Sequence, residues 1–174
     1  MTTVHLVRHG AVLNPNHVVY ADLESFNLSP LGVRQAHATA RHLARERVDI
    51  VITSPLARAH QTATAIARRH GLVAETKPSL TETRQYPGWT GRRWEELDTA
   101  FPGQVERYLA DASSLDDVHE RLDEVADRVH TVIEATRAAG HDTIVVVGHQ
   151  DPTQAARLAM TGRPLSALRV SPPA

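Results

Sequence analysis

Short β-branched runs alternate with longer helical patterns along most of this chain, and this alternation restricts the fold more than any other feature. The runs cover residues 3–7, 49–53, 73–77 and 143–147, of which the third is the weakest and the last the strongest. Each is short and apolar, as buried parallel strands are. We therefore expect an α/β domain, built as a three-layer αβα sandwich around a mainly parallel central sheet.

Helix start and stop signals fill the intervals between these runs. Ser-Pro pairs predict the first two helices, and Ser114 with Asp117 three residues later resembles a capping box ahead of the third. Glycines close the last three of the four predicted helices, at Gly71, Gly140 and Gly162. The four helices are expected at residues 30–47, 55–71, 115–140 and 152–162.

Two stretches, residues 11–28 and 78–113, show no clear periodicity. They hold most of the aromatic side chains of the chain. Long connections of this kind often cover a functional site, so we expect both stretches to act as lids. Their aromatic residues are expected to serve local packing more often than contact with a substrate.

Composition sets the outer limits. A chain of 174 residues with 41% hydrophobic residues fits one domain, residues 1–174. The net charge of −1 gives no field that would attract nucleic acid or a membrane surface, so neither is an expected partner. The chain has no cysteine, which excludes disulfides and thiolate chemistry. Without an apolar leader or spanning run, we expect a cytoplasmic protein.

The side chains that could take part in a reaction stand where the predicted strands end. Arg8 and His9 follow the first strand directly, and His149 follows the fourth. In a parallel sheet these strands end at the same edge, where ligands bind. Arg58 lies in the first turn of the helix after the second strand, and Glu82 follows the third strand after a short connection. Two histidines, two arginines and a carboxyl group are thus expected to converge.

This set of side chains suits the transfer of a phosphoryl group. Arg8 and Arg58 supply fixed positive charge for the phosphate oxygens, and a protonated His149 would add a third cationic donor. A neutral imidazole is a good nucleophile near pH 7, so His9 is the candidate to attack phosphorus. Glu82 is the candidate that donates a proton to the leaving group and later activates water. Such a mechanism needs no metal and no other cofactor.

Four sequence blocks then resemble a known family. They are Leu-Val-Arg-His-Gly at 6–10, Leu-Ser-Pro-Leu-Gly at 28–32, Thr-Ser-Pro-Leu-Ala-Arg-Ala at 53–59 and Val-Val-Gly-His at 146–149. In this order and spacing they are similar to the histidine phosphatase superfamily, also called phosphoglycerate-mutase-like. The resemblance implies that His9 is the phosphorylated nucleophile and Glu82 the acid-base group. Arg8, Arg58 and His149 would form the phosphate pocket.

The chain departs from the family pattern in places. Ala11 and Val12 stand where an acidic or amide residue and a threonine are common, and Asn14 is a candidate to replace the lost hydroxyl. Gln150 is a further candidate for contact with the substrate, although turn and cap roles would also explain it and Asn14. Family members usually continue into one more strand beyond residue 174. We therefore expect either a shortened chain or a sheet that lacks this last edge strand.

Three functions remain open. The first is a phosphatase that acts on a small phosphorylated metabolite, and a mutase on the same scaffold would need additional basic residues such as Arg84, Arg92 and Arg93. The second is a non-catalytic phosphate-binding module. The third is a metallohydrolase that uses His9, His149 and Asp151, although two nearby arginines would oppose a cation. The sequence identifies neither the metabolite nor the oligomeric state.

Overall fold

The computed structural model describes residues 2–83 and 86–169, and they form the expected α/β domain. The sheet in these ranges has the strands β1 Thr3–Arg8, β2 Ile50–Thr53, β3 Glu75–Thr76 and β4 Thr143–Gly148. Their order is β1-β4-β2-β3, and every pair is parallel. The question of a missing last strand concerns residues 170–174 and beyond, which lie outside the described ranges.

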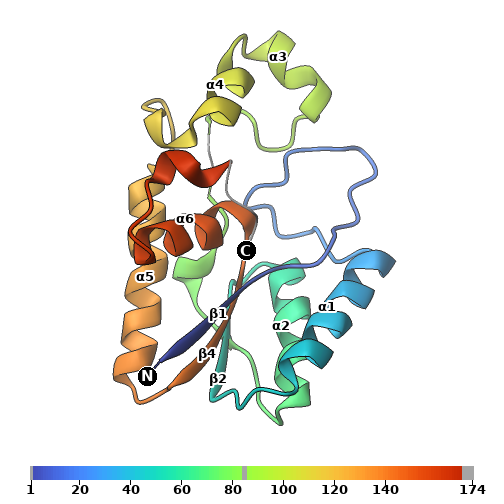
Figure 1. Cartoon of the computed structure of the whole chain (residues 1–174). Coiled ribbons are helices and arrows are strands. Elements are labelled where there is room, and N and C mark those ends of the chain that lie inside the picture. The colour runs from blue at the N-terminus through green and yellow to red at the C-terminus, as the bar shows by residue number, and fades with distance from the viewer. Residues whose placement is uncertain (1, 84–85, 170–174) are drawn as a thin grey trace.

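Helices cover both faces of this sheet. The longer helices are α1 Pro30–Leu43, α2 Ala57–Arg69, α5 Leu122–Ala138 and α6 Gln150–Met160. Figure 1 shows α1 and α2 on one side of the strands and α5 and α6 on the other, which confirms the three layers. Within the described ranges, no helix combines the length and the apolar character needed to cross a membrane.

The central strand β4 shows how the two cores arise. Its residues are buried on both faces, and successive side chains point to opposite sides. Val145 and Val147 pack in the cluster with Ile66 of α2, whereas Ile144 and Val146 pack in the cluster with Ile133 of α5. The continuous apolar run of β4 therefore contributes side chains to the core on both faces of the sheet.

Some predicted element boundaries were wrong. The third strand is limited to two exposed residues at the edge of the sheet, and α1 ends four residues early. The third helix begins at Leu122 and not after Ser114, because the Ser114 hydroxyl bonds to Asp111 O in a short 3₁₀ turn. The cap of α5 comes instead from Glu124, whose carboxylate accepts the Arg121 N–H at 2.8 Å.

The two aperiodic stretches, residues 11–28 and 78–113, lie together and are called the cap below. They include the short helices α3 Leu97–Ala100 and α4 Gln104–Ala110, which lie beyond the carboxyl ends of the strands in Figure 1. The backbone of Val19 joins the two stretches by bonds to Arg92 O and from Gly91 N, each 2.8 Å. Trp89 and Tyr108 are buried in a third apolar cluster, which confirms their packing role.

The turn that follows β1 presses directly against the start of α1. A Cβ atom on Gly10 would lie 2.5 Å from Gly32 O, and one on Gly32 would lie 2.0 Å from Ala11 O. The close approach is fixed by polar bonds, since Ser29 N donates to Ala11 O at 2.8 Å and Ala11 N donates to Gln35 Oε1 at 2.7 Å. Only glycine fits at either contact position.

Candidate active site

His9 and His149 meet at the carboxyl edge of the sheet. Their strands, β1 and β4, are neighbours, with Arg8 opposite Gly148 in the register. The centroids of the two imidazole rings lie 5.2 Å apart. His9 is 7% exposed and His149 is fully buried, so the His9 ring is the more accessible of the two.

One nitrogen of the His9 ring is held by a hydrogen bond to the backbone. Nδ1 lies 2.8 Å from Gly10 O, an acceptor, so Nδ1 carries the proton and Nε2 keeps its lone pair. The Gly10 N–H in turn donates to Thr62 Oγ1 at 3.2 Å. Burial, together with the positive charge of Arg58 and Arg8, lowers the pKa of His9 to about 4. The ring is therefore neutral, with a free nitrogen, at neutral pH.

His149 is anchored from the side of β2. Its Nε2 lies 2.7 Å from the Ser54 hydroxyl oxygen. Burial first, then the neighbouring His9 and Arg58, hold its pKa well below the usual value. The condition under which His149 would add a third cationic donor, a protonated ring, is therefore disfavoured by this environment. A neutral imidazole still donates one hydrogen bond.

The two arginines differ in burial. Arg58 is fully buried, with its guanidinium bonded to Leu23 O at 2.9 Å and to Ala21 O, and it lies 4.7 Å from the centroid of the Tyr20 ring. The cap backbone thus orients this side chain. Arg8 is exposed and donates to Gln150 Oε1 at 2.9 Å. Both positive charges act on His9.

Glu82 lies next to His149. Its carboxyl Oε2 is 3.9 Å from His149 Nδ1, and its side chain is 13% exposed. The Thr83 N–H donates to Oε1 at 2.9 Å. Burial, followed by the negative charge of Asp151, raises the pKa of Glu82 to about 8 despite that bond and the opposing charges of Arg58 and Arg8. The carboxyl group is therefore protonated at neutral pH.

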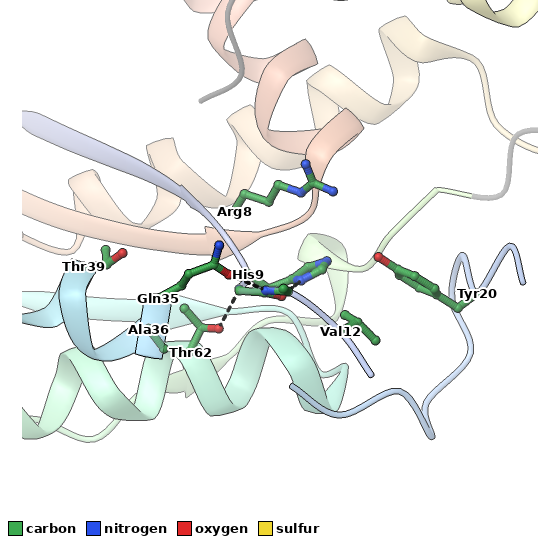
Figure 2. Close-up of a pocket in the computed structure, with 10 residues that line it drawn as sticks. Arg8, His9, Val12, Tyr20, Gln35, Ala36, Thr39 and Thr62 are labelled. Atoms are coloured by element: carbon green, nitrogen blue, oxygen red, sulfur yellow. Dashed lines mark hydrogen bonds between the residues drawn. The ribbon is translucent and has the colours of Figure 1, made fainter. Parts of the chain in front are cut away.

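Two cavities adjoin these residues. One, of about 430 Å³, is open to His9, and Figure 2 shows His9 and Tyr20 facing each other across it. The second, of about 310 Å³, is lined by Glu82 and other residues of the cap together with the start of α6. Arg8 and Tyr20 line both. The walls of the second cavity also include the side chains of Val18, Trp94, Tyr108, Leu109, Gln150, Asp151 and Arg169.

The two weaker candidates have different surroundings. Gln150 lines the second cavity and orients Arg8. The Asn14 side chain makes two hydrogen bonds to the backbone of Val18. Its Nδ2 donates to Val18 O at 2.8 Å, and its Oδ1 accepts the Val18 N–H at 3.1 Å. These bonds fit the turn role that was the alternative for Asn14, and its contact with phosphate stays a prediction.

Sequence reasoning missed three polar residues around the histidines, namely Tyr20, Ser54 and Thr62. Ser54 was expected to start a helix, but α2 begins at Ala57 and the Ser54 hydroxyl meets His149. Its place directly after a strand was the available signal, the same one that identified His9. Thr62 lies one helical turn after Arg58 and so shares its face. Tyr20 lies in an irregular loop and has no local signal.

Of the residues that the alternative functions require, Arg92, Arg93 and Asp151 bond to other groups, whereas His9 and His149 lie in the site described above. The Arg92 side chain donates to Gly88 O at 3.1 Å, and Arg93 pairs with Glu95 at 3.6 Å. Arg84 lies outside the described residues. No group of three or more histidine and acidic side chains in the described ranges is arranged to hold a metal ion. The Asp151 carboxylate accepts instead from Tyr108 and from Arg169.

Relatives with known sequences match nearly the whole chain. An uncharacterized protein of Mycobacterium tuberculosis, Rv0525, is 39% identical, over 94% of this chain and 81% of that protein. Phosphoserine phosphatase 1 of Hydrogenobacter thermophilus is 31% identical, over 95% and 79%. Both relatives are therefore longer than this chain, and the alignment covers most of this chain and most of each relative.

Solved structures agree with these sequence matches. Mycobacterial glucosyl-3-phosphoglycerate phosphatase has 25% identity and a TM-score of 0.84, over 97% of this chain and 83% of its own. The complex of that phosphatase with inorganic phosphate gives 25% identity and a TM-score of 0.83, over the same shares. The model of the histidine phosphatase superfamily, branch 1, matches residues 4–172. This chain belongs to the histidine phosphatase superfamily, branch 1.

Proposed function

We propose that this protein is a phosphatase that hydrolyses small phosphate monoesters through a phosphohistidine on His9. The observation that carries the proposal is the state of the His9 ring. It is neutral, its Nδ1 is fixed on Gly10 O, and Nε2 remains for attack beside a fully buried guanidinium. Relatives named as phosphatases support the same reaction class.

In the first step, His9 Nε2 attacks phosphorus and the bond from phosphorus to the ester oxygen breaks. Arg58 and Arg8 stabilise the negative charge on the phosphoryl oxygens, the largest contribution in such transfers. Glu82 gives its proton to the departing oxygen, which leaves as an alcohol. His149 donates one hydrogen bond to the transferring group. No metal or other cofactor takes part.

In the second step, ionised Glu82 takes a proton from water as the water attacks phosphorus. The bond from phosphorus to Nε2 breaks, inorganic phosphate leaves, and His9 and Glu82 return to their starting states. The two steps use one carboxyl group as acid and then as base. The second cavity beside Glu82, about 310 Å³, would receive the alcohol portion of the ester, which limits the substrate to a small metabolite.

A screen of small phosphate esters with the wild type and His9→Ala in parallel tests this function. We expect turnover and acid-labile phosphate on the wild-type protein, and neither on the variant. Turnover by His9→Ala would reject His9 as the nucleophile. Phosphate binding without turnover of any ester would favour a non-catalytic module. His60→Ala, an exposed histidine of α2, is a matched control and should behave as wild type.

A further inference from the structure

A buried cluster of three side chains lies next to the proposed acid and takes no part in the mechanism above. The Asp151 carboxylate accepts from the Tyr108 hydroxyl at 2.8 Å and from Arg169 NH2 at 2.8 Å. The Arg169 guanidinium lies 4.1 Å from the centroid of the Tyr108 ring. The three residues come from α6, from α4 in the cap and from the segment after α6.

Glu82 and Asp151 share one cavity. Both residues line the 310 Å³ space beside the strand ends, and Asp151 is only 4% exposed. The negative charge of Asp151 acts on the Glu82 carboxyl group and disfavours a second negative charge beside it, so one of the two carboxyl groups keeps a proton. The surroundings of the two carboxyl groups decide which of them is protonated.

The hydrogen-bond partners of the two carboxyl groups differ, and this difference decides which group carries the proton. Asp151 accepts from a phenol and from a guanidinium, and both bonds favour its ionised form. The Glu82 carboxyl has a backbone bond from Thr83 and lies 3.9 Å from the neutral His149. The ionised partner is therefore Asp151, and the proton belongs on Glu82.

We propose that Asp151, clamped by Tyr108 and Arg169, is a positioning residue that holds Glu82 in the proton-donating form. This inference rests on the proposed function and assigns a role to residues outside its reaction steps. Asp151 does not touch the phosphoryl group. It acts through Glu82, because its negative charge makes the ionised form of Glu82 less favourable in the shared cavity.

Other charges around Glu82 set the expected size of the effect. The charged and titratable side chains that act on it or line the same cavity are Arg8, Tyr20, Arg58, Tyr108, His149, Asp151 and Arg169. Arg58 and Arg8 favour the ionised form and oppose Asp151. Burial, the largest cause of the raised pKa of Glu82, persists without Asp151. Loss of the Asp151 charge should therefore lower this pKa only in part.

The variant Asp151→Asn tests this role, because it removes the charge and keeps an oxygen for Tyr108 and Arg169. For an alkyl phosphate, we expect the basic limb of kcat/KM to move about one pH unit lower. Activity should fall about fivefold at pH 8 and about tenfold at pH 9 relative to wild type, and stay near wild type at pH 5.5. Nitrophenyl phosphate, whose leaving group needs no proton, should show neither change.

Two further variants serve as controls. Asp151→Glu keeps the charge and should return the basic limb toward the wild-type pH. Asp127→Asn removes an exposed carboxylate of α5 and should leave the profile unchanged. An unshifted basic limb in Asp151→Asn would overturn the proposal. An equal loss for both substrates at every pH would also overturn it, because that result indicates a purely structural clamp between α4 and α6.

A measurement without turnover separates this inference from the proposed function. The Glu82 carboxyl can be titrated by ¹³C NMR, with Glu82→Gln to assign the signal. We expect a lower pKa for Glu82 in Asp151→Asn than in wild type, and an unchanged titration would reject the role of Asp151. If no ester is hydrolysed but this shift occurs, the proposed function fails while the coupling between the two carboxyl groups stands.

Discussion

The two ends of the site are built in different ways. At the proposed phosphate end, hydrogen bonds hold each group: Gly10 O fixes His9, Ser54 fixes His149, and the backbone carbonyls of Ala21 and Leu23 hold the buried Arg58. At the end proposed to face the leaving group, the walls come largely from side chains of the cap, and Trp94 is 43% exposed. The difference indicates that the sheet edge and the cap backbone supply fixed geometry, whereas the exposed side chains of the cap supply the surface proposed to select among esters.

The largest effect should follow a change at the phosphate end. Arg58→Lys keeps the charge but loses the planar fork, so we expect kcat/KM to fall by about 10²- to 10³-fold for every ester. Steady-state kinetics on several esters measure this effect. Arg68→Lys, an exposed substitution on α2, should change little. A loss of less than tenfold in folded Arg58→Lys would show that charge alone governs this end.

A smaller effect, restricted to some esters, should follow a change in the proposed acid. Glu82→Gln cannot donate a proton, so kcat for alkyl phosphates should fall by about 10²-fold. For nitrophenyl phosphate the fall should be severalfold at most. Glu96→Gln, an exposed cap residue, is the control. Equal losses for both esters would remove the distinction between the two ends of the site.

The pH dependence should report one group from each end. His9 must be neutral, and its pKa is lowered to about 4, so activity should rise as the pH increases through about 4. Glu82 must be protonated, and its pKa is raised to about 8, so activity on alkyl phosphates should fall as the pH increases through about 8. Beyond either limb, kcat/KM should change about tenfold per pH unit. If the basic limb persists in Glu82→Gln, it belongs to another group.

The smallest effect should come from the exposed wall of the cap. Trp94→Ala removes contact area from the second cavity, so KM for esters with bulky alcohol portions should rise about three- to tenfold. The value of kcat should change little, because Trp94 is distant from the reacting atoms. Leu13→Ala, another exposed cap residue outside both cavities, is the control. A large fall in kcat would show that the cap also sets the reaction geometry.

The sequence could predict the groups at the strand ends better than those in the cap. Parallel strands end at one edge, so His9 and His149 could be placed together before any coordinates were known. Arg58 followed from its position in the first turn of α2. The convergence of these groups depends on the order of the strands in the sheet, and the adjacency of β1 and β4 supplies it.

The cap was not predictable in the same way. Its two stretches are joined by backbone bonds such as Val19 N to Arg92 O, and residues so far apart give no local periodicity. The cluster of Tyr108, Asp151 and Arg169 has the same origin, since each member comes from a different element. Helix boundaries failed where a side chain had a tertiary partner, as with Ser54 and His149.

The contact between Gly10 and Gly32 has a consequence for how this protein can change over generations. The carbonyl of Gly10 orients the reactive imidazole, and Gly32 is the surface on which the Gly10 backbone rests. A side chain gained at position 32 would rotate that carbonyl without touching any ligand. A side chain at either position is therefore disfavoured, whereas exposed cap side chains that hold no group of the site, such as Leu13, are less restricted. Under the proposed function, new substrate preferences in descendants of this protein should arise above an unaltered glycine pair.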